Sequence, residues 1–433
     1  MTIQTHHLTP TGATERIQTI DMLRGFALLG ILLVNMGLFT HSFYYFVLGL
    51  QPENMVDKIA HYAVQFFAEG KFYSMFSFLF GLGMAIFMQR AEQKEVPFVR
   101  LYSRRLFALL LFGLVHAYLI WIGDILLLYS VIGFLTLFLF RNRKPRTLLI
   151  WAGVFLCIPL VINGALWALL ALSSMAMGAE VEAATATTME MYRGLNDAAN
   201  AAYANGSFAE VTRQRVSDMN MVFATWPFMA FNVWAMFLLG FAAGKSRLHE
   251  NLAAHKALLK RVLFWGLAVG LVGNLAYVVG AAYSNRLTPD GVNLLALVGQ
   301  TFGAPALSMF YMAGVALLAL QQSWRARFAP VASAGRMAIT NYLAQSLICT
   351  LIFYGYGLGF YGAGQAACVL LAVIIWLVEV AWSVWWLKHF RFGPVEWLWR
   401  TITYWEGQPM RLAAPTLSPT AAGGAGTPGS RAA

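Results

Sequence analysis

Long apolar runs, broken by short polar stretches rich in Lys and Arg, make up most of this chain of 433 residues. A helix needs about 17 to 25 largely apolar residues to cross the roughly 30 Å hydrocarbon core of a bilayer. Runs of this length lie at 20–38, 68–89, 104–122, 124–140, 147–172, 222–244, 258–284, 293–320, 338–357 and 366–388. The pattern predicts an all-α integral membrane protein, a polytopic bundle of about ten transmembrane helices.

The composition fits this class and excludes a soluble globular domain, because 59% of the residues are hydrophobic and only 11% are charged. In a soluble chain the net charge of +11 would suggest nucleic-acid binding. In a membrane protein, however, Lys and Arg accumulate in the cytosolic loops. The position of the basic residues therefore decides what their charge means.

The basic residues alternate with the predicted helices. If the N-terminus lies in the cytosol, most of the 30 Lys and Arg residues fall on the cytosolic side. The exceptions are Lys58, Lys71, Arg193, Arg213, Arg215 and Arg286. We therefore expect both termini in the cytosol, a secondary attraction to anionic membrane lipids, and no nucleic-acid partner.

The predicted helices divide the chain into segments of different character. The polar stretch after the fifth helix should form an extracytoplasmic loop or cap, and the Ala-, Gly- and Pro-rich end should be disordered. The expected division is 1–19, a cytosolic N-terminal segment; 20–172, the first five transmembrane helices with the candidate catalytic hairpin; 173–221, the extracytoplasmic loop or cap; 222–388, the last five helices; 389–412, a cytosolic interfacial segment; and 413–433, a disordered tail.

The stretch "GLVHAYLIWIGDILLLYS" places an imidazole, His116, and a carboxylate, Asp124, in apolar surroundings. The third and fourth predicted helices are separated only by Gly123, so a tight hairpin can fold the carboxylate back toward the imidazole. Ionisable groups within spans usually face a cavity and carry function, and His116 would then be a general acid or base oriented by Asp124. Two structural interpretations compete: Asp124 as a helix N-cap, and His116 bonded to a backbone carbonyl.

The first predicted helix, "IDMLRGFALLGILLVNMG", carries Asp21, Arg24 and Asn35. At 100° per residue, Arg24 and Asn35 share one face. This face could hold an anion at the cytosolic end and polarise a carbonyl near the middle of the membrane. The alternative is an Asp21 N-cap with a membrane-edge Arg24 and Asn35 as a contact between helices.

Four further polar residues form a second list of candidates. His41 lies among aromatic residues typical of a membrane interface, and the pair Glu69 and Lys71 could be a solvated helix start. Glu379, inside the last predicted helix, needs a partner that the nearby sequence does not provide. The spacing of the cysteines is not that of a metal site, and we expect no metal.

Four stretches carry a family resemblance: "IDMLRGFALLGILLVNM", "EGKFYSMFSFLFGLG", "RRLFALLLFGLVHAYLIWIGDILLLYS" and "FGPVEWLWRTITYWEGQPMR". They resemble the bacterial YeiB-like membrane proteins, whose C-terminal half is domain of unknown function 418. That family is grouped with the transmembrane acyltransferases, which include heparan-α-glucosaminide N-acetyltransferase. The resemblance implies an acyltransferase of the bacterial cytoplasmic (inner) membrane that uses acyl-CoA, with acetyl-CoA as the first donor to consider.

The resemblance extends to individual residues. The Asp-x-x-Arg-Gly opening of the superfamily matches Asp21, Arg24 and Gly25, and its Asn-x-Gly matches Asn35 and Gly37. The lysosomal enzyme has its catalytic His after that Asn, at a longer spacing than that of His41 in this chain.

In YeiB-like sequences the polar pair is instead the His and Asp that match His116 and Asp124, which we therefore favour over His41 as the catalytic pair. The closing signature contributes Gly393, Pro394, Glu396, Trp397 and Arg400. This signature can equally be an interfacial anchor helix.

The resulting hypothesis is acyl transfer from cytosolic acyl-CoA to an extracytoplasmic hydroxyl or amine on a glycan or lipid-linked acceptor. His116 would be the base, Asp124 would orient it, and Asn35 would support the oxyanion. The donor phosphates would be held at the cytosolic face by Arg24, Arg104 or Arg105, and Arg400. Asp21, three residues before Arg24, belongs to the same expected donor site.

Two other functional classes remain open: a small-molecule or lipid transporter with an intramembrane His/Asp relay, and a structural membrane protein. A basic groove leading to His116 would favour acyl-CoA, two alternately closed vestibules would favour transport, and a tightly packed His116 would favour the structural class. A homo-oligomer is also open.

Overall fold

A computed structural model describes residues 17–283 and 291–412, except for the side chain of Phe228. Within these ranges the chain forms α-helices, one π-helix and no strand, with a single isolated bridge between Phe390 and Arg411. The predictions for residues 1–16 of the N-terminal segment and for the tail 413–433 lie outside the described residues.

Seven helical segments of the described chain are long and apolar enough to cross a membrane. They are α1 (Gln18–Thr40), α3 (Met55–Phe67) continued by α4 (Lys71–Gln93), α5 (Phe98–Val115) continued by the π-helix η1 (His116–Ile120), α7 (Pro145–Ala176), α10 (Lys256–Tyr283), α11 (Gly291–Ala319) and α15 (Gln365–His389). The multi-pass, all-helical class is therefore confirmed.

Three further helices bear on the number of crossings. The long helix α9 (Phe208–Lys245) contains Pro227 and bends sharply there, since proline removes a helical hydrogen bond. Its two parts count as an eighth span if they cross together. Helices α6 (Leu126–Leu139) and α14 (Ala338–Phe353) are apolar but shorter. Each of the ten predicted runs overlaps a described helix, and ten membrane crossings stay a prediction.

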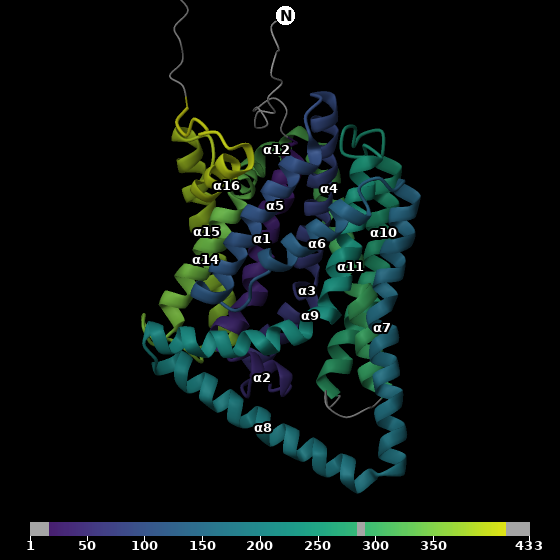
Figure 1. The fold of residues 1–433 in the computed structure, drawn as a ribbon, viewed down its shortest axis with the longest axis vertical. Coiled ribbons are helices and arrows are strands. Elements are labelled where there is room, and N and C mark those ends of the chain that lie inside the picture. The colour runs from purple at the N-terminus through teal and green to yellow at the C-terminus, as the bar shows by residue number, and fades with distance from the viewer. Residues whose placement is uncertain (1–16, 284–290, 413–433) are drawn as a thin grey trace, which may run out of the picture.

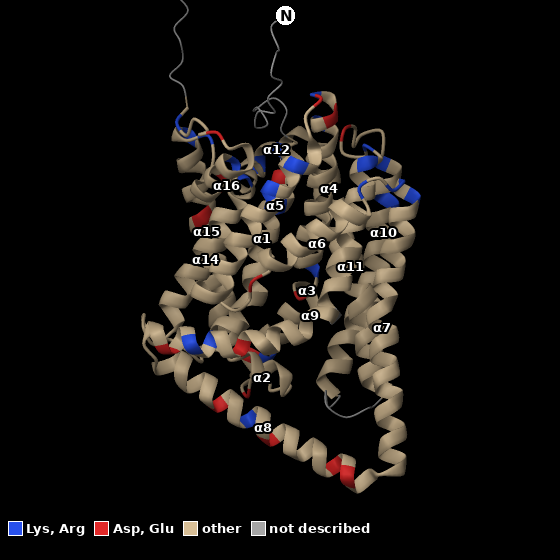
Figure 2. Ribbon diagram, in the orientation of Figure 1, with Lys and Arg blue, Asp and Glu red and all other residues tan. Residues whose placement is uncertain are grey.

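The short helices gather at the two ends of the bundle. Helices α12 (Gln322–Arg327) and α16 (Pro394–Tyr404) lie at the end nearest the start of the chain, whereas α2 (Phe43–Val47) and α8 (Gly178–Asn205) lie at the opposite end (Figure 1). Most of the described Lys and Arg residues lie toward the first end, which we call the basic end, while α8 carries both signs of charge (Figure 2). We call the opposite end the α8 end.

Helix α1 lies in the interior and positions the candidate site. It packs against α4, α13 (Ala329–Arg336), α14 and α15, and more than half of its apolar window is buried. Helix α7 lies at the margin of the bundle (Figure 1), and only 11% of its apolar window is buried within the protein. The bundle thus has a packed centre around α1 and an apolar outer surface suited to lipid.

Close packing of α4 against α9 yields a first prediction. A Cβ atom at Gly240 would overlap the backbone carbonyl of Phe78, which cannot move without shifting α4. We expect Gly240→Ala to destabilise the protein by about 1–3 kcal/mol, measured by thermal unfolding in detergent. The matched control is Gly153→Ala on α7, where no atom lies within 4 Å. Equal stability of the two variants would contradict the packing.

Candidate active site

The site is built around the hairpin between α5 and α6. Helix α5 widens at its end into the five-residue π-helix η1, which begins at His116, and such insertions are frequent at functional sites. The chain then turns through Gly123, where a Cβ atom would overlap the Trp121 ring. This close turn brings Asp124 back to His116, as the spacing predicts.

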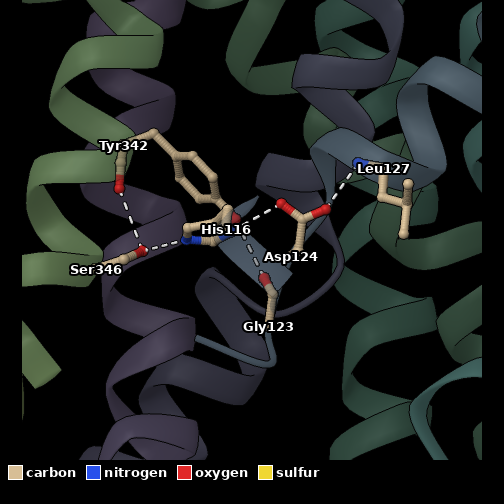
Figure 3. Close-up of polar contacts among 6 residues, drawn as sticks. All are labelled: His116, Gly123, Asp124, Leu127, Tyr342 and Ser346. Carbon is tan, nitrogen blue, oxygen red and sulfur yellow. Dashed lines mark hydrogen bonds and ion pairs between the residues drawn. The ribbon is translucent and has the colours of Figure 1, made fainter. Parts of the chain in front are cut away.

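A chain of hydrogen bonds runs through His116 (Figure 3). Its Nδ1 lies 2.7 Å from Oδ2 of Asp124, and its Nε2 lies 2.8 Å from the Ser346 hydroxyl on α14. The Tyr342 ring packs at 5.0 Å, and the Tyr342 hydroxyl donates to the carbonyl of Gly123. His116 is fully buried, and both of its ring nitrogens contact side chains rather than a backbone carbonyl.

Asp124 has two structural partners at once. Its Oδ1 accepts a hydrogen bond from the backbone N–H of Leu127 at 2.7 Å, while Oδ2 faces His116. The N-cap of α6 is Ile125 rather than Asp124 as expected, but Asp124 still binds the first turn of α6 from one residue further back, and this contact is compatible with the orienting interpretation. The carboxylate links the start of α6 to the end of α5 and aligns the imidazole with Ser346.

A first cavity, which we call the arginine cavity, lies toward the basic end. The described residues that give it charge are Arg24, Arg105, Arg336, Arg400 and Glu396. Its volume is about 150 Å³, enough for a narrow arm of a ligand but not for a large molecule. Arg24 also contacts Asp21 at 3.4 Å, so Asp21 lies beside the cavity.

The adjacent residues Arg104 and Arg105 have different positions. The guanidinium of Arg105 stacks on the Trp399 ring at 3.6 Å and lines the arginine cavity. Arg104 stacks on Trp405 at 5.3 Å and is not among the lining residues. The structure therefore brings Arg24, Arg105 and Arg400 together and leaves Arg104 outside.

Helix α16 is hydrogen-bonded to the start of α14 through Glu396. A helix that served only as an anchor at the membrane interface would not need this contact. Glu396 accepts hydrogen bonds from the N–H groups of Ile339 and Thr340 and from the Thr340 hydroxyl. These groups lie at the start of α14, the helix that carries Tyr342 and Ser346. Burial raises the pKa of the Glu396 carboxyl, while the hydrogen bonds act in the opposite direction.

A second cavity, which we call the amide cavity, lies on the other side of Tyr342 and has a volume of about 440 Å³. Its polar lining includes Asn35, Glu69, Asp124, Asn163, Thr225, Asn232, Gln300 and Thr301. Among the described lining residues, the only charged side chains are those of Glu69 and Asp124. Asn35 and Asp124 therefore face a space that a ligand can occupy.

The two cavities share a wall made of Ile31, Ile125 and Tyr342. His116 is not among the residues that line either cavity, because Asp124 and Tyr342 lie on the cavity side. Asp124 lies between the amide cavity and His116, with its side chain only 1% exposed and both carboxylate oxygens hydrogen-bonded. His116 as a base that itself touches the acceptor stays a prediction.

The second-list residues have varied surroundings. His41 ends α1, with Nδ1 3.0 Å from the Thr40 hydroxyl and its ring against Tyr45, which agrees with an aromatic interface. The Tyr277 hydroxyl donates to Glu69 at 2.7 Å. The buried Glu379 accepts from the Gln345 amide at 2.7 Å.

The interpretation of Lys71 as part of a solvated helix start is wrong. Its side chain is fully buried, and Nζ donates to the backbone carbonyl of Gln65 at 2.8 Å. The physical reason is the break between α3 and α4, where Gly70 has a left-handed φ of 84°. Lys71 thereby satisfies a carbonyl at the end of α3 that has no helical partner.

Sequence reasoning did not single out Arg336, Tyr342, Gln345 or Ser346. The last three lie on one predicted helix, 338–357, within "TNYLAQSLICT". Polar residues recur there three to four positions apart, the spacing of a helix face that contacts other polar groups. This spacing could have identified from the sequence the helix face that carries Tyr342, Gln345 and Ser346.

The chain is similar in sequence to several known proteins. Residues 243–406 match a family described as a protein of unknown function, DUF418. The uncharacterized protein YxaH of Bacillus subtilis (strain 168) is 39% identical over 93% of this chain and 98% of its own length. The uncharacterized protein YeiB of Escherichia coli (strain K12) is 29% identical over 94% of this chain and 99% of its own length. The chain therefore belongs to the YeiB-like family of membrane proteins.

Proposed function

We propose that this protein is a transmembrane acyltransferase of the bacterial cytoplasmic membrane, with ten spans and both termini in the cytosol. It moves an acyl group from cytosolic acyl-CoA to a hydroxyl or amine on the other side. The observation that carries this proposal is a pair of cavities of opposite charge that share one wall. The basic end carries most of the described Lys and Arg residues (Figure 2) and is the cytosolic end in this proposal.

The arginine cavity is the donor site. Acyl-CoA carries phosphates, and guanidinium groups bind phosphates through charge-assisted, often bidentate hydrogen bonds. Arg24, Arg105, Arg336 and Arg400 reach this cavity from four different helices. The narrow space suits the pantetheine arm, which would carry the thioester toward the wall at Tyr342.

The acceptor occupies the amide cavity. Its oxygen or nitrogen attacks the thioester carbonyl carbon, the new ester or amide bond forms, and the carbon–sulfur bond breaks. The proton of the acceptor passes to the Asp124–His116 pair and from there to the thiolate of CoA, which leaves as the thiol. Asn35 donates a hydrogen bond to the developing oxyanion.

The opposite charges also argue against transport of one substrate through both cavities. A transported anion would suit the arginine cavity but meet Glu69 and Asp124 in the amide cavity, while a cation would meet the arginines. Two different ligands, one in the arginine cavity and one in the amide cavity, can match the charges of both cavities. A group-transfer reaction needs such an arrangement.

The test is binding of acetyl-CoA to the purified protein in detergent, measured by calorimetry. We expect micromolar affinity that falls as salt is raised, and far weaker binding of S-acetylpantetheine, which lacks the adenosine phosphates. Absence of binding by acetyl-CoA and by longer acyl-CoAs would remove the donor and with it the proposal. Equal affinity for acetyl-CoA and S-acetylpantetheine would remove the role of the arginine cavity.

A further inference from the structure

The amide cavity continues sideways. A third space, which we call the side cavity, is lined from α7 by Asn163 and Trp167 and from α11 by residues between Asn293 and Gln300. It shares Glu69, Asn163, Leu297 and Gln300 with the amide cavity. The two spaces therefore adjoin each other, and we call them together the vestibule, which extends from Asp124 to the lining residues of α7 and α11.

The helices that bound this vestibule face lipid. On α7, Val161 and Leu170 are exposed on either side of the lining residues Asn163 and Trp167. On α11, Leu295 and Val298 are exposed, and Leu294 both lines the side cavity and reaches the surface. The vestibule thus lies next to exposed apolar side chains of α7 and α11.

The polar residues that line the vestibule favour a sugar over a phosphate as the head group of a ligand. Five side-chain amides, those of Asn35, Asn163, Asn232, Asn293 and Gln300, offer both donors and acceptors. The carboxylate of Glu69 is held by Tyr277, and no Lys or Arg occurs among the described lining residues of either space. A phosphate placed there would be desolvated without a cation, whereas the hydroxyls of a sugar could be satisfied.

We propose that the acceptor is a glycolipid that enters from the bilayer between α7 and α11. Its uncharged or amine-bearing sugar lies in the amide cavity near Asp124, and its lipid chain stays against the apolar faces of α7 and α11. This inference deepens the proposed function and rests on it in one respect: the bound glycolipid is called the acceptor because acyl transfer is proposed. The placement of sugar and chain rests on the vestibule alone.

The experiment is photolabelling in vesicles of phosphatidylethanolamine and phosphatidylglycerol, without any acyl-CoA. The probe is a glucosyl diacylglycerol with a diazirine on the sugar, and the comparison probe is the same diazirine sugar without lipid. Labelled peptides are mapped by mass spectrometry. We expect the lipid-bearing probe to label the segments around Asn163 and Gln300, and the free sugar to label them at least about tenfold less.

Two variants on α11 distinguish a probe that enters the vestibule from a probe that only contacts the outer surface of the protein. Leu297→Trp should fill the vestibule and remove at least about nine tenths of that labelling, whereas Leu295→Trp, on the lipid-exposed face, should leave it unchanged. Equal labelling by the free sugar, or labelling that is unaffected by Leu297→Trp, would overturn the proposal. Labelling that succeeds in a protein that fails to bind acetyl-CoA would retain the glycolipid site and reject acyl transfer.

Discussion

Replacing Arg105 with Met is expected to weaken acetyl-CoA binding by about 10- to 100-fold, whereas Arg104→Met leaves it within about twofold. A hydrogen bond to a charged group contributes about 1.5–3 kcal/mol, and each 1.4 kcal/mol corresponds to about tenfold in affinity. Arg105 lines the arginine cavity and is held against Trp399 at 3.6 Å, so its guanidinium is already oriented for a phosphate. Arg104 lies against Trp405, outside the lining.

The two arginines form a matched pair, since they are adjacent in sequence and carry the same charge. Calorimetry at one salt concentration gives the affinity, and the melting temperature in detergent shows whether each variant is folded. Arg105→Lys tests geometry, because lysine keeps the charge but not the planar fork. If neither Arg105→Met nor Arg24→Met changes the affinity for acetyl-CoA, the arginine cavity is not the donor site.

The predicted helices follow from periodicity and length, because apolar runs of membrane-spanning size have no other stable form in lipid. The approach of Asp124 to His116 also follows from the sequence, since only a short turn separates their helices. Contacts within one hairpin are local, and local spacing is enough to predict them.

Contacts between distant helices do not follow in the same way. Ser346 lies 230 residues from His116, and the partner of Glu379 depends on how α14 packs against α15. The difference between Arg104 and Arg105 depends on helix rotation, since neighbouring residues point about 100° apart. A single sequence shows which residues are polar, but not which of them face a common space.

The arrangement also changes how the catalytic pair is understood. From the sequence, we expect His116 to lie next to the acceptor and Asp124 to lie behind His116. In the structure Asp124 lines the amide cavity, while His116 lies behind it between the carboxylate and Ser346. In the proposed reaction, a proton taken from the acceptor would therefore pass first to the carboxylate and then to the imidazole, which would hold it until the thiolate leaves.

Removing the Asp124 carboxylate should also destabilise the fold strongly. Asp124→Ala leaves the N–H of Leu127 and one nitrogen of the fully buried His116 without their present partners. Breaking a buried pair of this kind by removing one member costs about 3–5 kcal/mol. We expect a large loss of thermal stability in detergent, well beyond that of Gly240→Ala.

Asp124→Asn separates the structural role from the chemical one. The amide oxygen can still accept from Leu127, and the amide nitrogen can donate to Nδ1 if His116 changes tautomer and donates from Nε2 to Ser346. Most of the stability should therefore return, with a loss below about 2 kcal/mol, while transfer from acetyl-CoA falls by at least about 100-fold because the carboxylate is gone. Thermal unfolding and release of CoA thiol measure the two effects. Equal stability of the Ala and Asn variants would show that the carboxyl group does not hold the hairpin, and an Asn variant with full activity would show that the proton does not pass through Asp124.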